Sequence, residues 1–364
     1  MNLLSSTSVF GFYTLLSRVL GYLRDILIAF FLGTSIYADA FFVAFRLPNT
    51  FRRLFAEGTF NAAFIPSYAQ EKLKGESHGK KFADDVFNLL LYVLIIIIII
   101  VEIFAPFVVY LIAPGFYENS EKFNLATEFT RITFPFLLFV SLSSMLSGIL
   151  NTNNRFAAAA AAPIVLNLVL IISLILSYYL KLDIAKNLSI GVPIAGILQF
   201  LLLIIFSKKF YFPSLKLIIN FSKSLKSFFV KLLPSIFSSG ITQINILIGT
   251  IIASFQSGAV SYLYYADRIY QINLAIAGIA VGTVVLPNLS KSIKTNDESS
   301  VNLIQNRSIE LSLALSLPAA FGLLIASEDI VNSLFGYGSF DQKDILNTSL
   351  ALIFFALGVP AFAL

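Results

Sequence analysis

The feature that most constrains this chain is a series of long apolar stretches, each with about the length of a membrane-crossing helix. A helix needs about 20 mostly apolar residues to cross the hydrocarbon core of a bilayer. Hydrophobic residues make up 57% of the chain and charged residues 12%, about half the charged fraction of a typical soluble domain. We predict ten spans, near residues 8–33, 38–67, 86–112, 126–150, 157–180, 188–206, 232–255, 261–289, 307–334 and 346–364.

These stretches predict an all-α integral membrane protein. The run from Ile95 to Ile100 would favour a strand in water, but inside a long apolar segment it is predicted to be helical, because a lipid-exposed segment must satisfy its own backbone groups. The chain has no cysteine, which excludes disulfides and cysteine-bound metals. Its one histidine, His78, lies in the polar run from Lys72 to Lys81, where we expect a solvated loop residue. We therefore expect no catalytic residue, no metal and no cofactor.

The distribution of Lys and Arg between the loops predicts the orientation of the chain. Loops on the cytoplasmic side carry an excess of Lys and Arg. With the amino terminus in the cytoplasm, fourteen such residues lie inside and four outside. The inside set is Lys72, Lys74, Lys80, Lys81, Arg155, Lys208, Lys209, Lys216, Lys223, Lys226, Lys231, Lys291, Lys294 and Arg307, and the outside set is Lys122, Lys181, Lys186 and Lys343. The net charge of +5 is mostly this topology signal, so it does not indicate nucleic-acid binding.

A basic cytoplasmic linker at residues 207–231 divides the chain into two lobes. We predict an amino-terminal lobe at residues 1–206 with six spans, and a partial carboxy-terminal lobe at 232–364 with four. A shift of 221 residues aligns Pro66 with Pro287 and Gly115 with Gly336, which suggests a repeat of six spans per unit. The second unit would then be incomplete, so we expect the chain to be a fragment.

Seven arginines and no lysine remain inside the predicted spans. An arginine at a helix centre costs about 2.5–3.5 kcal/mol to insert, so this number of charges predicts an aqueous cavity. Arginine binds oxyanions such as phosphate through several hydrogen bonds at once, which lysine does not. The seven are Arg18, Arg24, Arg46, Arg52, Arg53, Arg131 and Arg268.

Helical spacing separates structural charges from anion-binding charges. Asp39, Arg46 and Arg53 follow one another at intervals of seven, and Glu57 lies one turn beyond Arg53, so these four are interpreted as mainly structural ion pairs. Arg18 and Asp25 are also seven apart and share a face of the first span, with Arg24 directed elsewhere unless Gly21 lets the helix bend. Asp267 is adjacent to Arg268 in the eighth span. The nearby acids are too few to neutralise every arginine, so we predict substrate binding by Arg18, Arg24, Arg52 and Arg268.

Several motifs resemble one known family over nearly the whole chain. They are SRVLGYLRD (17–25), ADAFFVAFRLPNTFRRLFAEGTFNAAFIP (38–66), APGF (113–116), ILNTNNRF (149–156) and YYADRIYQ with LPNLSKS (264–292). These stretches are similar to the MurJ (MviN) family of lipid II flippases, within the multidrug/oligosaccharidyl-lipid/polysaccharide exporter superfamily.

The resemblance implies a MATE-like, two-lobe exporter fold, with ten spans present of an expected fourteen. It also implies alternating access to a cationic cavity that carries lipid II, the lipid-linked peptidoglycan precursor, from the inner to the outer leaflet of the bacterial inner membrane. The family's cavity arginines fall on Arg18, Arg24, Arg52 and Arg268, with Asp25 and Asp39 beside them. Where many members have Glu, this chain has Gln271. The implied partners are lipid II, the bilayer and proteins of cell-wall synthesis, and most of any cation site would lie in the four further helices.

Two other functions are open from the residues themselves. The nearer alternative is an exporter of the same fold that moves O-antigen-type lipid-linked oligosaccharides or drugs. A drug–cation antiporter would favour acids over surplus arginines in its cavity. The other alternative is a membrane enzyme such as a polyprenyl transferase, which would bind a diphosphate through paired acids and Mg²⁺. The spans contain no DxxD or DxxxD pair, so the prediction is transport without covalent chemistry.

Overall fold

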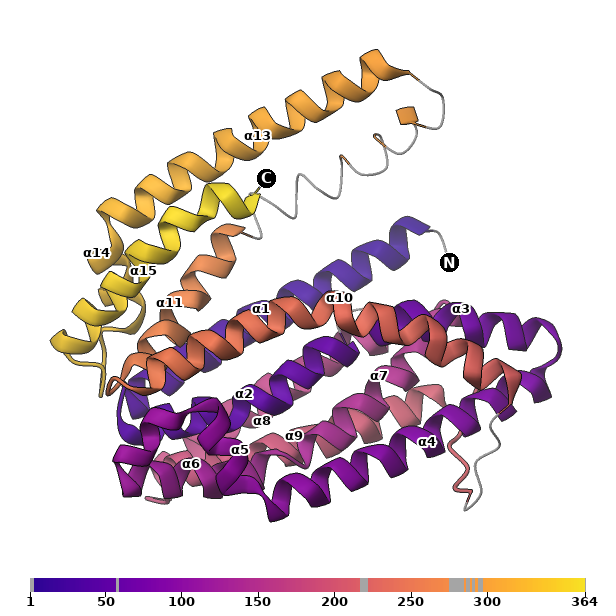
Figure 1. Cartoon of the computed structure of the whole chain (residues 1–364), viewed down its shortest axis with the longest axis horizontal. Coiled ribbons are helices and arrows are strands. Elements are labelled where there is room, and N and C mark those ends of the chain that lie inside the picture. Colours follow the sequence, from indigo (N-terminus) through magenta and orange to yellow (C-terminus); the bar gives the residue numbers. More distant parts are fainter. Residues whose placement is uncertain are drawn as a thin grey trace. The chain divides into compact units, whose positions relative to one another are not determined.

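All regular secondary structure in the described part of the chain is helical, and this part contains no strand (Figure 1). The computed structural model describes residues 3–56, 59–216, 222–274 and 297–363, with positions 285, 289, 292 and 293. The elements are α1 (Leu3–Leu32), α2 (Ile36–Ala56), α3 (Thr59–Leu73), α4 (Glu76–Ile103), α5 (Ala105–Ile112), the 3-10 helix η1 (Pro114–Glu118), α6 (Ser120–Thr133), α7 (Phe136–Thr152), α8 (Phe156–Tyr179), α9 (Ile184–Ser207), α10 (Lys223–Ser254), α11 (Ala259–Leu274), α13 (Glu298–Ile325), α14 (Ser327–Phe335) and α15 (Gln342–Ala363).

Each predicted span overlaps at least one of these helices, which confirms the all-α class. Within the described residues, six segments are long and apolar enough to cross a membrane, and the count of ten spans stays a prediction. The six are Glu76–Ile103, Ser120–Thr152, Phe156–Tyr179, Ile184–Ser207, Glu298–Ile325 and Gln342–Ala363. The isoleucine run lies inside α4 as predicted, and Ile96, Ile99 and Ile100 are largely exposed. Such an apolar outer surface fits lipid as the surrounding solvent.

Two predicted spans are each built from two consecutive helices that meet near a proline. The 86–112 span changes from α4 to α5 at Phe104, and Pro106 lies in the first turn of α5. The 126–150 span changes from α6 to α7 beside Pro135. Proline has no backbone N–H to donate and its ring clashes with the preceding turn, so a helix ends or restarts there.

The chain forms two compact units. The first comprises Met1–Ile28 and Ile36–Ser257, and the second comprises Ala29–Ser35 and Gly258–Leu364. The predicted lobe boundaries follow the position of the basic linker rather than contacts, and they stay a prediction.

The core of the first unit contains an aromatic cluster from three helices. Phe60, Phe64 and Tyr68 stack in sequence along α3, with ring centroids 5.3 and 5.6 Å apart. Phe82 of α4 stacks on Phe64 at 6.0 Å. Phe228 of α10 meets Phe60, Phe64 and Phe82 edge to face, at 5.6, 6.3 and 6.1 Å. These offset and edge contacts are the favoured aromatic geometries, and they fix the start of α10 against α3 and α4.

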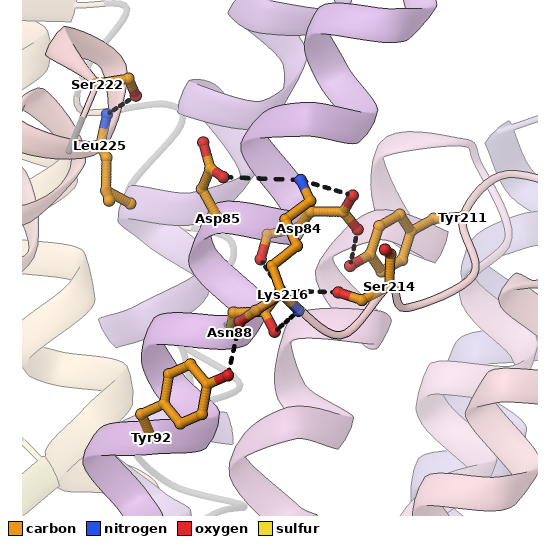
Figure 2. A network of polar contacts seen from close by, with 9 residues as sticks. All are labelled: Asp84, Asp85, Asn88, Tyr92, Tyr211, Ser214, Lys216, Ser222 and Leu225. Carbon is orange, nitrogen blue, oxygen red and sulfur yellow. Dashed lines mark hydrogen bonds and ion pairs between the residues drawn. The ribbon is translucent and has the colours of Figure 1, made fainter. Parts of the chain in front are cut away.

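Residues 211–216 of the basic linker, here called the strap, lie along α4 and are held by polar side chains of that helix (Figure 2). The amide nitrogen of Asn88 donates to the carbonyl of Ser214 at 2.8 Å, and its oxygen accepts from the backbone N–H of Lys216 at 2.9 Å. The Tyr92 hydroxyl donates to the carbonyl of Lys216 at 2.6 Å. These three bonds give the strap's backbone the partners that secondary structure would otherwise supply.

Two adjacent acids of α4 also bind side chains of the strap. The Lys216 ammonium lies 3.1 Å from a carboxylate oxygen of Asp84 and 3.9 Å from one of Asp85. The Tyr211 hydroxyl donates to Asp84 at 2.9 Å. Burial, followed by the charge of Asp84, raises the pKa of the Tyr211 hydroxyl, so this group remains a hydrogen-bond donor. Lys216 therefore differs from Lys208 and Lys209 of the same linker, which are exposed.

We expect Asn88→Leu to release the strap, because leucine has a similar volume but cannot form the bonds to Ser214 and Lys216. Trypsin should then cleave after Lys216 several times faster than in the wild type. Cleavage after the exposed Lys208 and Lys209 should not change and serves as the internal control. A time course on nanodisc-embedded protein, followed by mass spectrometry, measures all three sites. Equal cleavage after Lys216 in both proteins would mean that Asn88 does not hold the strap.

In the second unit, the turn that follows α1 packs against residues from the far end of the chain. Gly33 has a φ of +55°, a conformation that glycine adopts without strain. Its carbonyl accepts a hydrogen bond from the Tyr265 hydroxyl at 3.0 Å. The Thr34 hydroxyl donates to a carboxylate oxygen of Asp344 at 2.5 Å. The seven residues Ala29–Ser35 are thus an integral part of a unit that otherwise begins at Gly258.

Candidate functional site

Arg24 and Asp25, two of the predicted site residues, form a buried ion pair on α1. The Nε and Nη2 groups of Arg24 donate to the same oxygen of Asp25 at 2.9 and 2.6 Å. The two side chains are 8% and 2% exposed. The sequence argument placed Asp25 on the face of Arg18 and directed Arg24 elsewhere, because neighbouring residues on a helix point about 100° apart. The expectation for Arg24 is wrong, because its long side chain folds back to Asp25.

Asn167 of α8 is a third member of this group, and the sequence analysis missed it. Its side-chain oxygen accepts from Nη1 of Arg24 at 2.9 Å, and its nitrogen donates to the carbonyl of Ser17 at 2.9 Å. Asn167 packs against Gly21, where an added Cβ would lie 3.4 Å from the Asn167 nitrogen, an ordinary van der Waals distance. A buried asparagine in an apolar helix needs polar partners, and this could have signalled its role.

Arg18 and Arg52 are the other two predicted binding residues in the first unit. Arg18 lies on an exposed face of α1. Arg52 of α2 is half-buried, and its Nε donates to the side-chain oxygen of Asn49 at 2.9 Å. The side chain of Arg53 and the whole of Glu57 are outside the described part of the structure, so their proposed ion pair stays a prediction.

Asp39 of α2 is fully buried and pairs with Lys122 of α6. The Lys122 ammonium is 2.5 Å from a carboxylate oxygen of Asp39, and the two side chains are 6% and 0% exposed. The same ammonium lies 4.0 Å from the ring centroid of Phe116, a cation–π contact. The placement of Lys122 in an outside loop was wrong in one respect, because the residue lies in the first turn of α6 and is buried.

The predicted residues of the second unit lie close together on α11. The terminal nitrogen Nη2 of Arg268 donates to the Tyr264 hydroxyl at 3.0 Å, and its guanidinium carbon lies 4.6 Å from that ring's centroid. The Gln271 amide donates to Asp267 one turn away. Gln271 therefore contributes no charge but does have a defined partner. Tyr264, which orients Arg268, was not among the predicted site residues.

The chemistry of each arginine suits it to holding an anion. A guanidinium group has planar donor edges that match phosphate and carboxylate oxygens. Within the described residues, no group of three or more His, Asp or Glu side chains could hold a metal ion.

Comparison with solved structures defines the fold class. A multidrug resistance MATE family transporter of the MOP superfamily, in an inward-facing conformation, matches with a TM-score of 0.69 and 14% identity. The match covers 95% of this chain and 80% of that one. At this identity the likeness shows the fold alone. The chain thus has a MATE-like, all-helical fold.

Closer relatives specify the family. The family model for lipid II flippase MurJ matches residues 28–364. The probable lipid II flippase MurJ of Rhizobium tropici is 42% identical over 375 residues, which cover all of this chain and 69% of that protein. A solved structure of a lipid II flippase MurJ in an inward closed conformation matches with a TM-score of 0.84 and 31% identity, over 97% of this chain and 73% of that one. The chain belongs to the MurJ family.

Proposed function

We propose that this chain carries lipid II from the inner to the outer leaflet of the bacterial inner membrane. The observation that carries the proposal is family membership over residues 28–364. The family and the structural relatives are transporters, and translocation changes no covalent bond, so the chain is a transporter and not an enzyme. The likeness to drug exporters is one of fold alone, so lipid II is favoured over drugs or O-antigen-type lipids.

The proposed mechanism is alternating access of a cationic central cavity between two lobes, at residues 1–206 and 232–364. Lipid II has a pyrophosphate between its polyprenyl tail and its sugar–peptide head, and this group must pass through hydrocarbon. Arg18, Arg24, Arg52 and Arg268 would bind the pyrophosphate oxygens through charge-assisted hydrogen bonds. Enzymes of cell-wall synthesis, which make lipid II on one side and consume it on the other, are the partners that this function requires.

The decisive experiment replaces the resident flippase of a cell-wall-producing bacterium. Depletion of that flippase should stop lipid II from reaching the outer leaflet. Expression of a full-length protein that includes this chain should restore it. Normal membrane abundance without restored translocation would exclude lipid II as the substrate.

Alanine variants of Arg18, Arg52 and Arg268 test the binding role. Each variant should insert and accumulate normally, because loss of an arginine from a membrane helix removes an insertion cost of about 2.5–3.5 kcal/mol. Lipid II translocation should nevertheless fall at least about tenfold, the loss that corresponds to 1.4 kcal/mol of binding. Arg131→Ala is the matched control, since Arg131 is an exposed arginine of α6 outside the proposed site, and it should keep full activity. If abundance and activity fall together in the first three variants, those arginines are structural.

We also propose that the amino terminus is cytoplasmic. The burial of Lys122 removes it from the outside loops and leaves three Lys and Arg there against fourteen inside, which strengthens the charge asymmetry. Single cysteines at the exposed positions Ser77, Glu118 and Lys223 test the orientation in this cysteine-free chain. In intact cells, an impermeant maleimide should label only position 118. Labelling at 77 or 223 would reverse the topology.

A further inference from the structure

The guanidinium of Arg24 already holds an oxyanion in this structure. Its Nε and Nη2 groups both donate to one oxygen of Asp25, at 2.9 and 2.6 Å, while Nη1 donates to Asn167 at 2.9 Å. The Nε–Nη2 edge is one that carboxylate and phosphate bind in a bidentate manner. Asp25 is 2% exposed, so this edge of Arg24 is turned toward a protein carboxylate.

We propose that Asp25 is an internal competitor for the phosphate site of Arg24. When no substrate is bound, Asp25 occupies the edge that a pyrophosphate oxygen would use. Two oxyanions cannot share one bidentate edge, so the pyrophosphate has to displace Asp25, and Asp25 returns when the pyrophosphate leaves. The inference rests on the proposed function. It adds which group occupies Arg24 when no substrate is bound and how the pyrophosphate is released.

The local geometry favours such an exchange. Arg24 and Asp25 are neighbours on α1, so the competitor moves with the arginine, and the pair can open by rotation of side chains without movement of a helix. Asn167 contacts a different nitrogen, Nη1, and is itself fixed by its bond to the Ser17 carbonyl at 2.9 Å. This contact can persist during the exchange, and it would keep the guanidinium in place while its other edge changes partner.

Competition lowers affinity and speeds release. The net free energy of ligand binding is smaller when the arginine must first break a buried ion pair, because the ligand only replaces an existing charge-assisted bond. For a transporter this is useful, since a substrate bound too tightly would not leave on the far side. Asp25→Asn keeps an oxygen that can accept from Arg24 but removes the charge, so the competing bond becomes weaker.

Binding of undecaprenyl pyrophosphate to the full chain in nanodiscs tests the proposal. Asp25→Asn should lower Kd by about tenfold, the ratio that 1.4 kcal/mol produces, and should slow dissociation. Asp25→Ser provides a second neutral variant with the same expected direction. The control is Glu128→Gln, which removes a carboxylate from an exposed pair with Lys186 in the same unit and should leave Kd unchanged. That control separates loss of the competitor from a general gain of positive charge.

A double-mutant cycle with Arg24→Ala identifies the source of the gain. If Asp25 acts by occupying Arg24, Asp25→Asn should give no gain in affinity when Arg24 is already alanine. A gain that persists without Arg24, or neutral variants that bind no more tightly than the wild type, would overturn the competition. That result would leave the proposed function intact as long as the wild type still translocates lipid II. Failure of the wild type to bind or translocate would instead refute the function itself.

Discussion

Lys122→Met is expected to destabilise the first unit by about 3–5 kcal/mol, the usual cost of removing one partner from a buried ion pair. Methionine fills a similar volume but removes the ammonium that lies 2.5 Å from the carboxylate of Asp39, which is 0% exposed. The cation–π contact with Phe116 is lost as well. Membrane abundance and thermal unfolding of detergent-solubilised protein should both show the loss.

A second substitution distinguishes charge from packing at this pair. Adding Asp39→Asn to Lys122→Met removes the uncompensated carboxylate, and replacement of both partners of a buried pair is often close to neutral. The double variant should therefore recover most of the stability lost by Lys122→Met alone. If it is as unstable as the single variant, the defect comes from the packing of α6 and not from the stranded charge of Asp39.

Gly115→Ala is expected to have the other large effect, because the glycine of the APGF motif touches backbone. A Cβ at Gly115 would lie 2.5 Å from the carbonyl group of Ser254 and 2.5 Å from the backbone nitrogen of Phe255. The Gly115 N–H also donates to the Ser254 hydroxyl at 3.0 Å. Since backbone atoms cannot rotate away, η1 would have to move off the end of α10. Overpacking of this kind costs about 1–3 kcal/mol and can cost more.

Gly249→Ala supplies the control within the same helix, α10. A Cβ at Gly249 would have no atom within 4 Å, and alanine is favoured over glycine in a helix by about 1 kcal/mol. This variant should accumulate as well as the wild type or better, while Gly115→Ala should be depleted from the membrane. Equal abundance of both variants would show that η1 can shift without cost.

The helices could be predicted from the sequence because a short apolar run, which could be a strand or a helix in water, has to be helical inside a membrane span. The isoleucine run of α4 and the all-helical class follow from the requirement that a spanning segment satisfies its own backbone. The strap could not be predicted. It is irregular backbone held by Asn88 and Tyr92, more than 100 residues away, and no local pattern marks such a partnership.

The candidate site was only partly predictable, since spacing along a helix does not determine which way a long side chain folds. The arginines were identified because inserting an arginine into a membrane helix costs free energy. The pair of Arg24 with its immediate neighbour Asp25 was not expected, because helical spacing brings together residues three or four positions apart. Lys122 was misassigned because Asn119, Ser120 and Glu121 precede it and resemble a solvated loop. Its partner Asp39 is 83 residues away, a distance over which a single sequence gives no pairing information.

The turn after α1 has a consequence for how the protein is made. Thr34 emerges from the ribosome early, but its partner Asp344 follows 310 residues later. At about 5–20 residues per second, that interval is roughly 15–60 s. During this time the glycine-containing turn Ala29–Ser35 is in a nascent chain that has not yet produced Tyr265 or Asp344, so its final contacts cannot form. The second unit can therefore be completed only after Asp344 has been synthesised, and until then the turn after α1 lacks the partners that hold it.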